Sequence, residues 1–466
     1  MQLKYNNLKV VKAWCMFDWA NSVYNLVITT TFFPIYFLAV TKSAYGEESV
    51  PFMGRVFKNS ALYDYALAFA YLSIALLLPI LSSIADSQGN KKRFMQFFTY
   101  LGGLACIGMF WFRGDNIGLG IACFIFAVIG YAGGLVFYNS YLPEIAAPED
   151  RDKISARGYA MGYIGSVLLQ VIGFGLVLYF NAQAEATGNS DLKLQGPLIT
   201  FLLVGLWWMG FAQVTFRRLP ANKPSAEKFS YGFLTAGFIE LGKVLRQVRK
   251  LSVLKWYLTS FFFYNMGVQT VMLAATIFAS KMLGMPSDKL IITVVLIQLL
   301  AVVGAFLMSR LSAKYGNLLV LMGVVLFWIF LCVAAYEMAV LKEANPGEEA
   351  GKTIIMYFYF LAMCVGLVMG GIQSLSRSTY SKLMPVTNDT ASFFSFYDVT
   401  EKVAIVIGIF TFGYIDELLG MKHSVLSLIV FFMLGLIGLL ITYTKYLKSD
   451  QMLQPTDIKV RVTKSL

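Results

Sequence analysis

A run of polar side chains follows one face of an uncharged segment, residues 19–41. Asp18 precedes this segment and is followed at positions i+3, i+4 and i+7 by Asn21, Ser22 and Asn25. Residues at this spacing share one face of a helix. Polar groups in a long apolar segment usually face a cavity or a partner helix, so we expect this face to line a solute cavity, with Asp18 as a gate or proton-coupling site. Hydrogen bonding between helices is the alternative interpretation.

Three charged residues interrupt another apolar stretch, at about residues 390–415. Asp398 and Lys402 are i and i+4 neighbours and are expected to pair on the helix surface, which leaves Glu401 without a partner. This combination suits proton-coupled binding. Lys402 would hold a substrate carboxylate or a neighbouring acid, while Asp398 or Glu401 takes the proton. The alternative is an internal salt-bridge network that fixes helix packing or closes a gate.

Amides and tyrosines inside other apolar segments are further candidates for lining the cavity or binding the solute, with hydrogen bonds between helices as the alternative. Arg377 is instead expected at a membrane interface, where an arginine extends its charged head to water. The cavity candidates are Asn139, Tyr163, Gln170, Asn265, Gln269, Gln298 and Gln373.

A short loop combines an acid, a glycine and a basic cluster, namely Asp86, Gly89, Lys91, Lys92 and Arg93. An acid at a helix end next to a tight turn and basic residues could latch two helices together on the cytoplasmic side. We therefore interpret the loop as a cytoplasmic gate, with a purely topological charge cluster as the alternative.

Several kinds of site are excluded by the residues present. The five cysteines have no paired spacing and the only histidine is His423, so the sequence predicts neither a disulfide framework nor a metal site. Phosphate-loop, nucleophile-elbow and HExxH patterns are absent from the sequence. We expect no enzyme activity and no cofactor, so uphill movement of a solute would depend on an ion gradient or on the solute itself.

Membrane-spanning helices must position these residues. The chain of 466 residues is 58% apolar and 14% charged, and it contains eleven uncharged runs of 19 or more residues. A spanning helix needs roughly 20 mostly apolar residues and satisfies its own backbone hydrogen bonds in lipid. Together with the interrupted stretch near residues 390–415, these runs predict an all-α membrane protein with twelve transmembrane helices.

The basic residues predict the orientation. Lys and Arg number 38 against 26 acids, and most of them lie on one side of the membrane if both termini are cytoplasmic, as the positive-inside rule requires. The charge therefore indicates contact with anionic lipid headgroups, and no nucleic-acid partner is expected. The glycosylation sequon at Asn388 falls on the cytoplasmic side, which favours a bacterial inner (plasma) membrane over a vacuole. We expect a monomer.

A basic interval divides the predicted spans into six and six. Gly-Asn steps at 89–90 and 316–317 occupy matching positions in the two parts. Such a parallel repeat is the arrangement of major facilitator transporters, which bind substrate near the midplane. The predicted units are an N-terminal six-helix bundle (1–217), a cytoplasmic basic linker (218–252) with an amphipathic helix at 239–250, a C-terminal six-helix bundle (253–447) and a cytoplasmic tail (448–466).

The loop at 86–93 resembles the signature loop of the major facilitator superfamily, except that Ser82 and Ser87 replace a usual glycine and a usual basic residue. The sequence FDWANSVY at 17–24 is similar to the Tyr-Asp-Trp-Ala-Asn-Ser-x-Tyr motif of the vacuole-effluxer-like branch, also called the unknown major facilitator family. Further segments similar to that branch lie at 138–143, 155–163, 264–270 and 373–378.

The resemblance implies the major facilitator fold, with two pseudo-symmetric six-helix bundles, and solute transport; fungal members are associated with amino-acid export from the vacuole. We therefore expect a secondary active transporter that moves a small polar solute, such as amino acids or related metabolites, by alternating access and proton-coupled export. The alternatives are a lipid or drug exporter, which would favour an apolar cavity, and a non-transporting sensor or scaffold on the same fold.

Overall fold

The computed structural model describes residues 5–46, 49–220, 233–285, 287–345 and 348–453, which are mostly helical. The elements before residue 220 are α1 (Leu8–Val23), η1 (Tyr24–Phe32), α2 (Phe33–Tyr45), β1 (Ser49–Phe52), β2 (Arg55–Lys58), α3 (Asn59–Gln88), α4 (Lys91–Gly108), η2 (Met109–Trp111), α5 (Ile117–Ser140), α6 (Leu142–Ile145), η3 (Pro148–Asp150), α7 (Arg151–Thr187), η4 (Ser190–Leu194) and α8 (Gln195–Arg218). After residue 232 come α9 (Phe233–Lys250), α10 (Ser252–Lys281), α11 (Ser287–Tyr315), α12 (Asn317–Ala344), α13 (Glu348–Leu383), α14 (Thr390–Leu419) and α15 (Met421–Leu453).

Ten helical segments of the described chain are long and apolar enough to cross a membrane. The first of them, Leu8–Tyr45, runs through α1, η1 and α2. α10 and α14 are not among the ten, although each has 30 residues. In α14 the cause is the charge of Asp398, Glu401 and Lys402 near its middle. α14 is therefore as long as many of the other spans but carries charged side chains near its middle.

The first helical segment widens into a π-helix at η1. The hydroxyl groups of Thr30 and Thr31 both donate to the Leu26 carbonyl, at 2.9 and 3.0 Å. Side chains that bind carbonyls of the preceding turn disturb the regular α-helical ladder. The polar face that begins with Asp18 is therefore α-helical only as far as Val23, and Asn25 lies in the wider turn.

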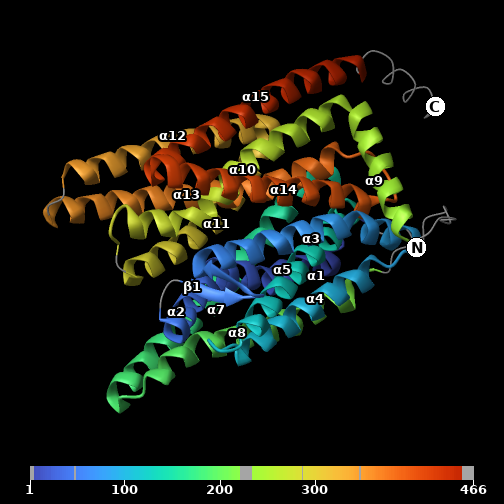
Figure 1. The fold of residues 1–466 in the computed structure, drawn as a ribbon. Coiled ribbons are helices and arrows are strands. Elements are labelled where there is room, and N and C mark those ends of the chain that lie inside the picture. The colour runs from blue at the N-terminus through green and yellow to red at the C-terminus, as the bar shows by residue number, and fades with distance from the viewer. Residues whose placement is uncertain (1–4, 47–48, 221–232, 286, 346–347, 454–466) are drawn as a thin grey trace, which may run out of the picture.

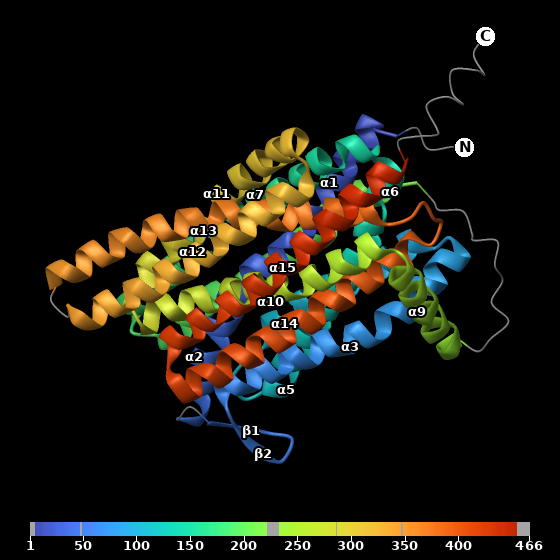
Figure 2. The ribbon, with the colours of Figure 1, turned by 90° about the horizontal axis from the view of Figure 1, so that it is seen from above.

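Two groups of helices pack side by side along their length (Figures 1 and 2). We call α1–α8 the first half and α10–α15 the second half. Between the halves, α7 lies against α11 and α13, and α3 lies against α14. The start of α1, the end of α15 and α9 lie at one end of the molecule, which we call the terminal end (Figure 1).

α9 contains the predicted amphipathic segment and lies across the terminal end, where it packs on α3 and α14. Val244 and Val248, one turn apart, are buried, whereas Arg246 and Arg249 are exposed. One face of the helix therefore contacts both halves and the other presents basic side chains.

Candidate functional site

A buried ion pair joins the two halves. The Arg377 guanidinium of α13 lies 3.2 Å from the Asp18 carboxylate of α1, and the two residues are 1% and 2% exposed. The Tyr138 hydroxyl donates to the same Asp18 oxygen at 2.6 Å. Because each charge is deprived of water, the pair depends on these partners, and removing one leaves the other uncompensated.

The guanidinium is held on all sides by the first half. Its nitrogens donate to the Ser155 hydroxyl and carbonyl, both at 2.9 Å, and to the Asn139 amide oxygen at 3.3 Å. Its carbon lies 4.2 Å from the ring centroid of Tyr159 and 4.8 Å from that of Trp14. The planar group therefore combines directional hydrogen bonds with cation–π contacts that a lysine would not reproduce.

Gly158 makes room for this pair. A Cβ placed on Gly158 would collide with the Asp18 carboxylate and lie 3.0 Å from Arg377 Nη2 and from the Tyr138 hydroxyl. The glycine is required by the close approach of charged groups, rather than by backbone conformation.

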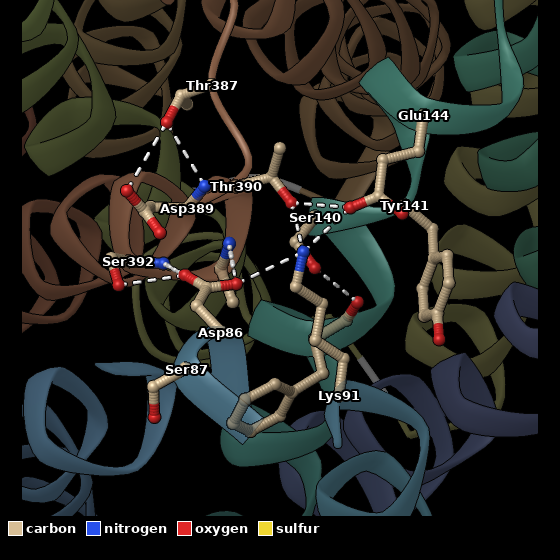
Figure 3. Close-up of polar contacts among 12 residues, drawn as sticks. Asp86, Ser87, Lys91, Ser140, Tyr141, Glu144, Thr387, Asp389, Thr390 and Ser392 are labelled. Carbon is tan, nitrogen blue, oxygen red and sulfur yellow. Dashed lines mark hydrogen bonds and ion pairs between the residues drawn. The ribbon is translucent and has the colours of Figure 1, made fainter. Parts of the chain in front are cut away.

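A second contact between the halves lies at the turn between α3 and α4 (Figure 3). Gly89 adopts the left-handed conformation (φ 66°) that closes α3. The Asp86 carboxylate then accepts from the backbone N–H groups of Ala391 at 3.2 Å and Ser392 at 2.8 Å, at the start of α14. The acid of the first half therefore satisfies free N–H groups at a helix N-terminus of the second half.

Lys91 extends this contact, which we call the latch. Its ammonium group lies 3.1 Å from Asp86 and 2.7 Å from Glu144, and Glu144 accepts from the Thr390 hydroxyl at 2.7 Å. Lys92 donates to the Leu219 carbonyl, within the first half, at 3.0 Å. Arg93 is exposed, and its side chain forms no hydrogen bond or ion pair with the described residues. Of the predicted gate residues, Asp86, Gly89 and Lys91 build the latch, whereas Lys92 and Arg93 take no part in its hydrogen bonds and ion pairs within the described residues.

A matching contact forms at a turn of the second half. Asp152, at the start of α7 in the first half, accepts from three residues of the second half: Lys382 at 2.6 Å, Ser312 at 3.0 Å and Asn317 at 2.7 Å. Asn317 follows Gly316 in the turn between α11 and α12, the position that matches the turn of the latch. The Gly-Asn repeat in the sequence marked this turn, but no local pattern identified Asp152 as its partner.

Between the halves, a small cavity lies next to the buried pair. Glu401 is its acidic lining residue; the Glu401 carboxylate accepts from Gln269 at 3.1 Å and from Lys402 at 2.8 Å. The Tyr264 hydroxyl is 2.7 Å from that of Ser376, the residue before Arg377. The complete lining is Tyr159, Phe261, Tyr264, Asn265, Val268, Ile372, Gln373, Ser376, Tyr397 and Glu401.

A pair of buried amides also connects the halves. Gln298 of α11 donates to Gln170 of α7 at 2.7 Å, and Gln170 donates to Thr31 at 2.9 Å. In this conformation both glutamines bind protein groups, as the alternative interpretation of their positions required.

The predicted lining residues are thus distributed over several places. Asn265, Gln373 and Glu401 line the cavity, and Gln269 and Lys402 bind Glu401. The others lie outside the cavity lining: Asn21 and Tyr163, which are buried with no hydrogen-bond partner for their polar atoms among the described residues, Ser22, packed on Gly162, Asn25, Asn139, Gln170 and Gln298.

Two predictions are wrong, one of a position and one of a pairing. Arg377 does not extend to water at an interface, because Asp18 and the aromatic rings enclose it. Lys402 pairs with Glu401 instead of Asp398, so that Glu401 has partners and the Oδ2 atom of Asp398 has none within the described residues. Gln269, on α10, also donates to Glu401 and so helps to hold Glu401 next to Lys402.

A larger cavity lies inside the second half and is lined mostly by apolar side chains, among them Val271, Phe278, Trp328, Phe358 and Leu428. The predicted site residues are absent from its lining. This cavity lacks the charged groups that would orient a polar solute.

The sequence of this chain is similar to those of known proteins. Residues 6–451 match the family model described as "Vacuole effluxer Atg22 like". The chain is 30% identical over 431 residues to the uncharacterized MFS-type transporter YxiO of Bacillus subtilis, covering 92% of this chain and 94% of the relative. It is 28% identical over 290 residues to autophagy-related protein 22 of Cryptococcus neoformans, covering 60% of this chain and half (50%) of that protein.

Solved transporters share the fold. The MFS transporter FucP in its outward conformation has a TM-score of 0.64 at 13% identity, covering 94% of this chain and 99% of that one. A bacterial homologue of the iron transporter ferroportin, in an outward-facing state with soaked iron, has a TM-score of 0.61 at 12% identity, covering 95% of this chain and 99% of that one. At this identity the likeness shows the fold alone. Together the matches show that the chain belongs to the Atg22-like vacuole effluxer family of MFS-type transporters, and that it is a multi-pass integral membrane protein of a non-enzyme class.

Proposed function

We propose that the protein is a secondary active transporter that exports a small polar solute, such as amino acids or related metabolites, by alternating access coupled to protons. The observation that carries this proposal is the set of contacts between the halves at the terminal end, next to a cavity that contains Glu401. A transporter needs a closed barrier on one side of its binding site, and polar contacts between two rigid units supply a barrier that can be broken.

In this proposal each half is a six-helix bundle, at residues 1–217 and 253–447, joined by the linker 218–252. The twelve helices cross the membrane with the terminal end and both termini in the cytoplasm, which makes the observed state closed to the cytoplasm. The basic face of α9 would rest on anionic headgroups of a bacterial inner membrane. The tail at 448–466 lies mainly outside the described residues. The protein would act as a monomer.

The coupling groups proposed are Asp18, Asp398 and Glu401. Asp18 would open the terminal end when protonated, because a neutral acid no longer compensates Arg377. Glu401 and Asp398 share Lys402 as their nearby cation, so a proton on either acid changes what Lys402 can bind.

Transport into proteoliposomes tests the proposal. We expect uptake of a labelled amino-acid panel to depend on a pH gradient in the wild type and to be lost in Lys402→Ala. Lys422→Ala is the matched control, since Lys422 forms an exposed pair with Glu343 at 2.6 Å. Equal uptake by wild type and Lys402→Ala would remove Lys402 from the site.

Export of an apolar solute is the second candidate, and the apolar cavity of the second half favours it. If a lipid or drug analogue saturates the protein and leaves amino-acid uptake unaffected, this result would support export of an apolar solute. Competition between the two solute classes would favour a single central site.

A further inference from the structure

Lys402 has two acids within reach on its own helix but binds one of them. Its ammonium group lies 2.8 Å from Glu401, whereas Asp398, one helical turn earlier, is 1% exposed and has no hydrogen-bond partner for Oδ2 within the described residues. Residues at i and i+4 are neighbours on a helix. A change of side-chain conformation would therefore move the ammonium group from Glu401 to Asp398 without moving the backbone.

The charges around the cavity do not balance in the observed arrangement. Asp18 and Arg377 compensate each other, and Lys402 compensates Glu401. If Asp398 is ionised, one negative charge remains in a buried site, which is costly. A further unit of positive charge, carried by a proton or by a bound cation, removes this cost.

No other described group compensates Asp398. The charged and titratable groups that act on it are Lys402 and Glu401 from α14, Arg377 and Tyr380 from α13, and Tyr159 from α7. Arg377 is committed to Asp18, and a neutral tyrosine adds no charge. Of the described groups, Lys402 is therefore the cation that can compensate Asp398, provided that it leaves Glu401.

The cavity beside Lys402 has the lining of a cation site. Four aromatic rings, from Tyr159, Phe261, Tyr264 and Tyr397, surround it together with the Glu401 carboxylate. The faces of aromatic rings attract ammonium ions, and a carboxylate adds a full countercharge. Glu401 would repel a carboxylate in the same cavity, so a solute with a net positive charge is favoured over a zwitterion.

We propose that this site exchanges one proton for one organic ammonium ion, with Lys402 as the switch. In the observed state Lys402 pairs with Glu401 and Asp398 carries the proton. When the ammonium ion binds Glu401, Lys402 moves to Asp398, and Asp398 releases its proton to water. One positive charge enters and one leaves, so the net charge of the site is unchanged. The exchange rests on the proposed transport function and narrows the solute to one with a net positive charge.

Calorimetric binding to the purified full-length protein tests the exchange without any transport step. The probes are two cations, methylammonium and choline, and their zwitterionic counterparts, glycine and betaine. Titration in buffers of different ionisation enthalpy measures the protons released. We expect about one proton for each cation bound, and an affinity that rises about tenfold per pH unit while Asp398 is protonated in the free protein. Glycine and betaine should bind much more weakly.

Three variants isolate the parts of the switch. Asp398→Asn should release no proton, and its cation affinity should not depend on pH. Glu401→Gln should weaken cation binding by about tenfold or more. Glu343→Gln is the control, because Glu343 is exposed and paired with Lys422 outside this site; it should behave as the wild type does.

Two results would overturn the exchange. One is binding of neither cation, or of glycine or betaine as tightly as the cations; the other is cation binding with no proton released by the wild type. Failure of reconstituted protein to move any solute would instead count against the transport function, since binding and proton release are measured in its absence.

Discussion

Asp18 of α1 and Arg377 of α13 lie 3.2 Å apart across the two halves of the molecule, although 359 positions separate them in the chain. Both are buried, and the Arg377 side chain reaches from the second half into the first. The pair lies next to the cavity of Glu401, since Tyr159 contacts the guanidinium and lines that cavity. In the proposed mechanism, Tyr159 would therefore take part both in solute binding and in closure of the terminal end.

Removing the arginine should destabilise the protein strongly. Arg377→Ala leaves Asp18 buried without its countercharge, and we expect a loss of about 3–5 kcal/mol together with loss of transport. The measurement is thermal unfolding in detergent, alongside proteoliposome uptake. In the double variant Asp18→Ala/Arg377→Ala the loss should be smaller than the sum of the single losses. Additive losses would show that the two groups do not interact.

Adding a methyl group at Gly158 should disrupt the same pair. Gly158→Ala places a Cβ against the Asp18 carboxylate, so uptake should fall at least several-fold. Gly175→Ala, on the same helix, is the matched control because nothing lies within 4 Å of the added atom. Alanine raises the helix propensity equally at the two positions, so a difference between the variants measures the collision. Equal activity in both would contradict the close approach described.

The latch should respond to loss of its acid. Asp86→Ala removes the acceptor for two backbone N–H groups at the start of α14, which we expect to cost about 0.5–2 kcal/mol. Asp86→Asn retains an acceptor oxygen and should lose less. Arg93→Ala, at an exposed residue outside the latch, should leave the unfolding temperature unchanged. An Arg93→Ala effect as large as that of Asp86→Ala would mean that overall charge, and not the helix N-terminus, stabilises this end.

The amide pair predicts a non-additive result. Gln298→Leu leaves the Gln170 oxygen buried without a donor, and this should lower the free energy of unfolding by about 1–3 kcal/mol. Replacing both glutamines by leucine removes both unpaired groups and should cost less than two single replacements. Thermal unfolding of the three variants gives the comparison. If each glutamine acts independently, the double variant will instead show the full sum.

Local patterns in the sequence predicted what depends on neighbouring residues. Uncharged runs located the long helices, and the spacing of Asp86, Gly89 and Lys91 located a turn that contacts the other half. The interruption of α14 drew attention to Glu401 and Lys402, which the structure places at the cavity. In each case the residues that form the pattern lie within one helical turn or one loop.

Contacts between distant segments could not be predicted in this way. Nothing near Arg377 in the sequence indicates that Asp18 is its partner, so its expected position at an interface was wrong. Lys402 has acids at i−1 and i−4, and the donor Gln269 on another helix helps to decide between them. The π-helix at η1 was missed because it depends on how two threonine hydroxyls bind one carbonyl.

In the proposed mechanism, contacts between the halves hold the terminal end closed and break during transport. Spin labels on cysteines introduced at Gln88 and Val386, two exposed residues beside the latch on opposite halves, report this directly once the five native cysteines are replaced. Pulsed electron paramagnetic resonance should give one short distance in the otherwise unmodified protein and a longer, broader distribution in Arg377→Ala. The same short distance in both proteins, at every pH tested, would show that these contacts do not hold the terminal end closed.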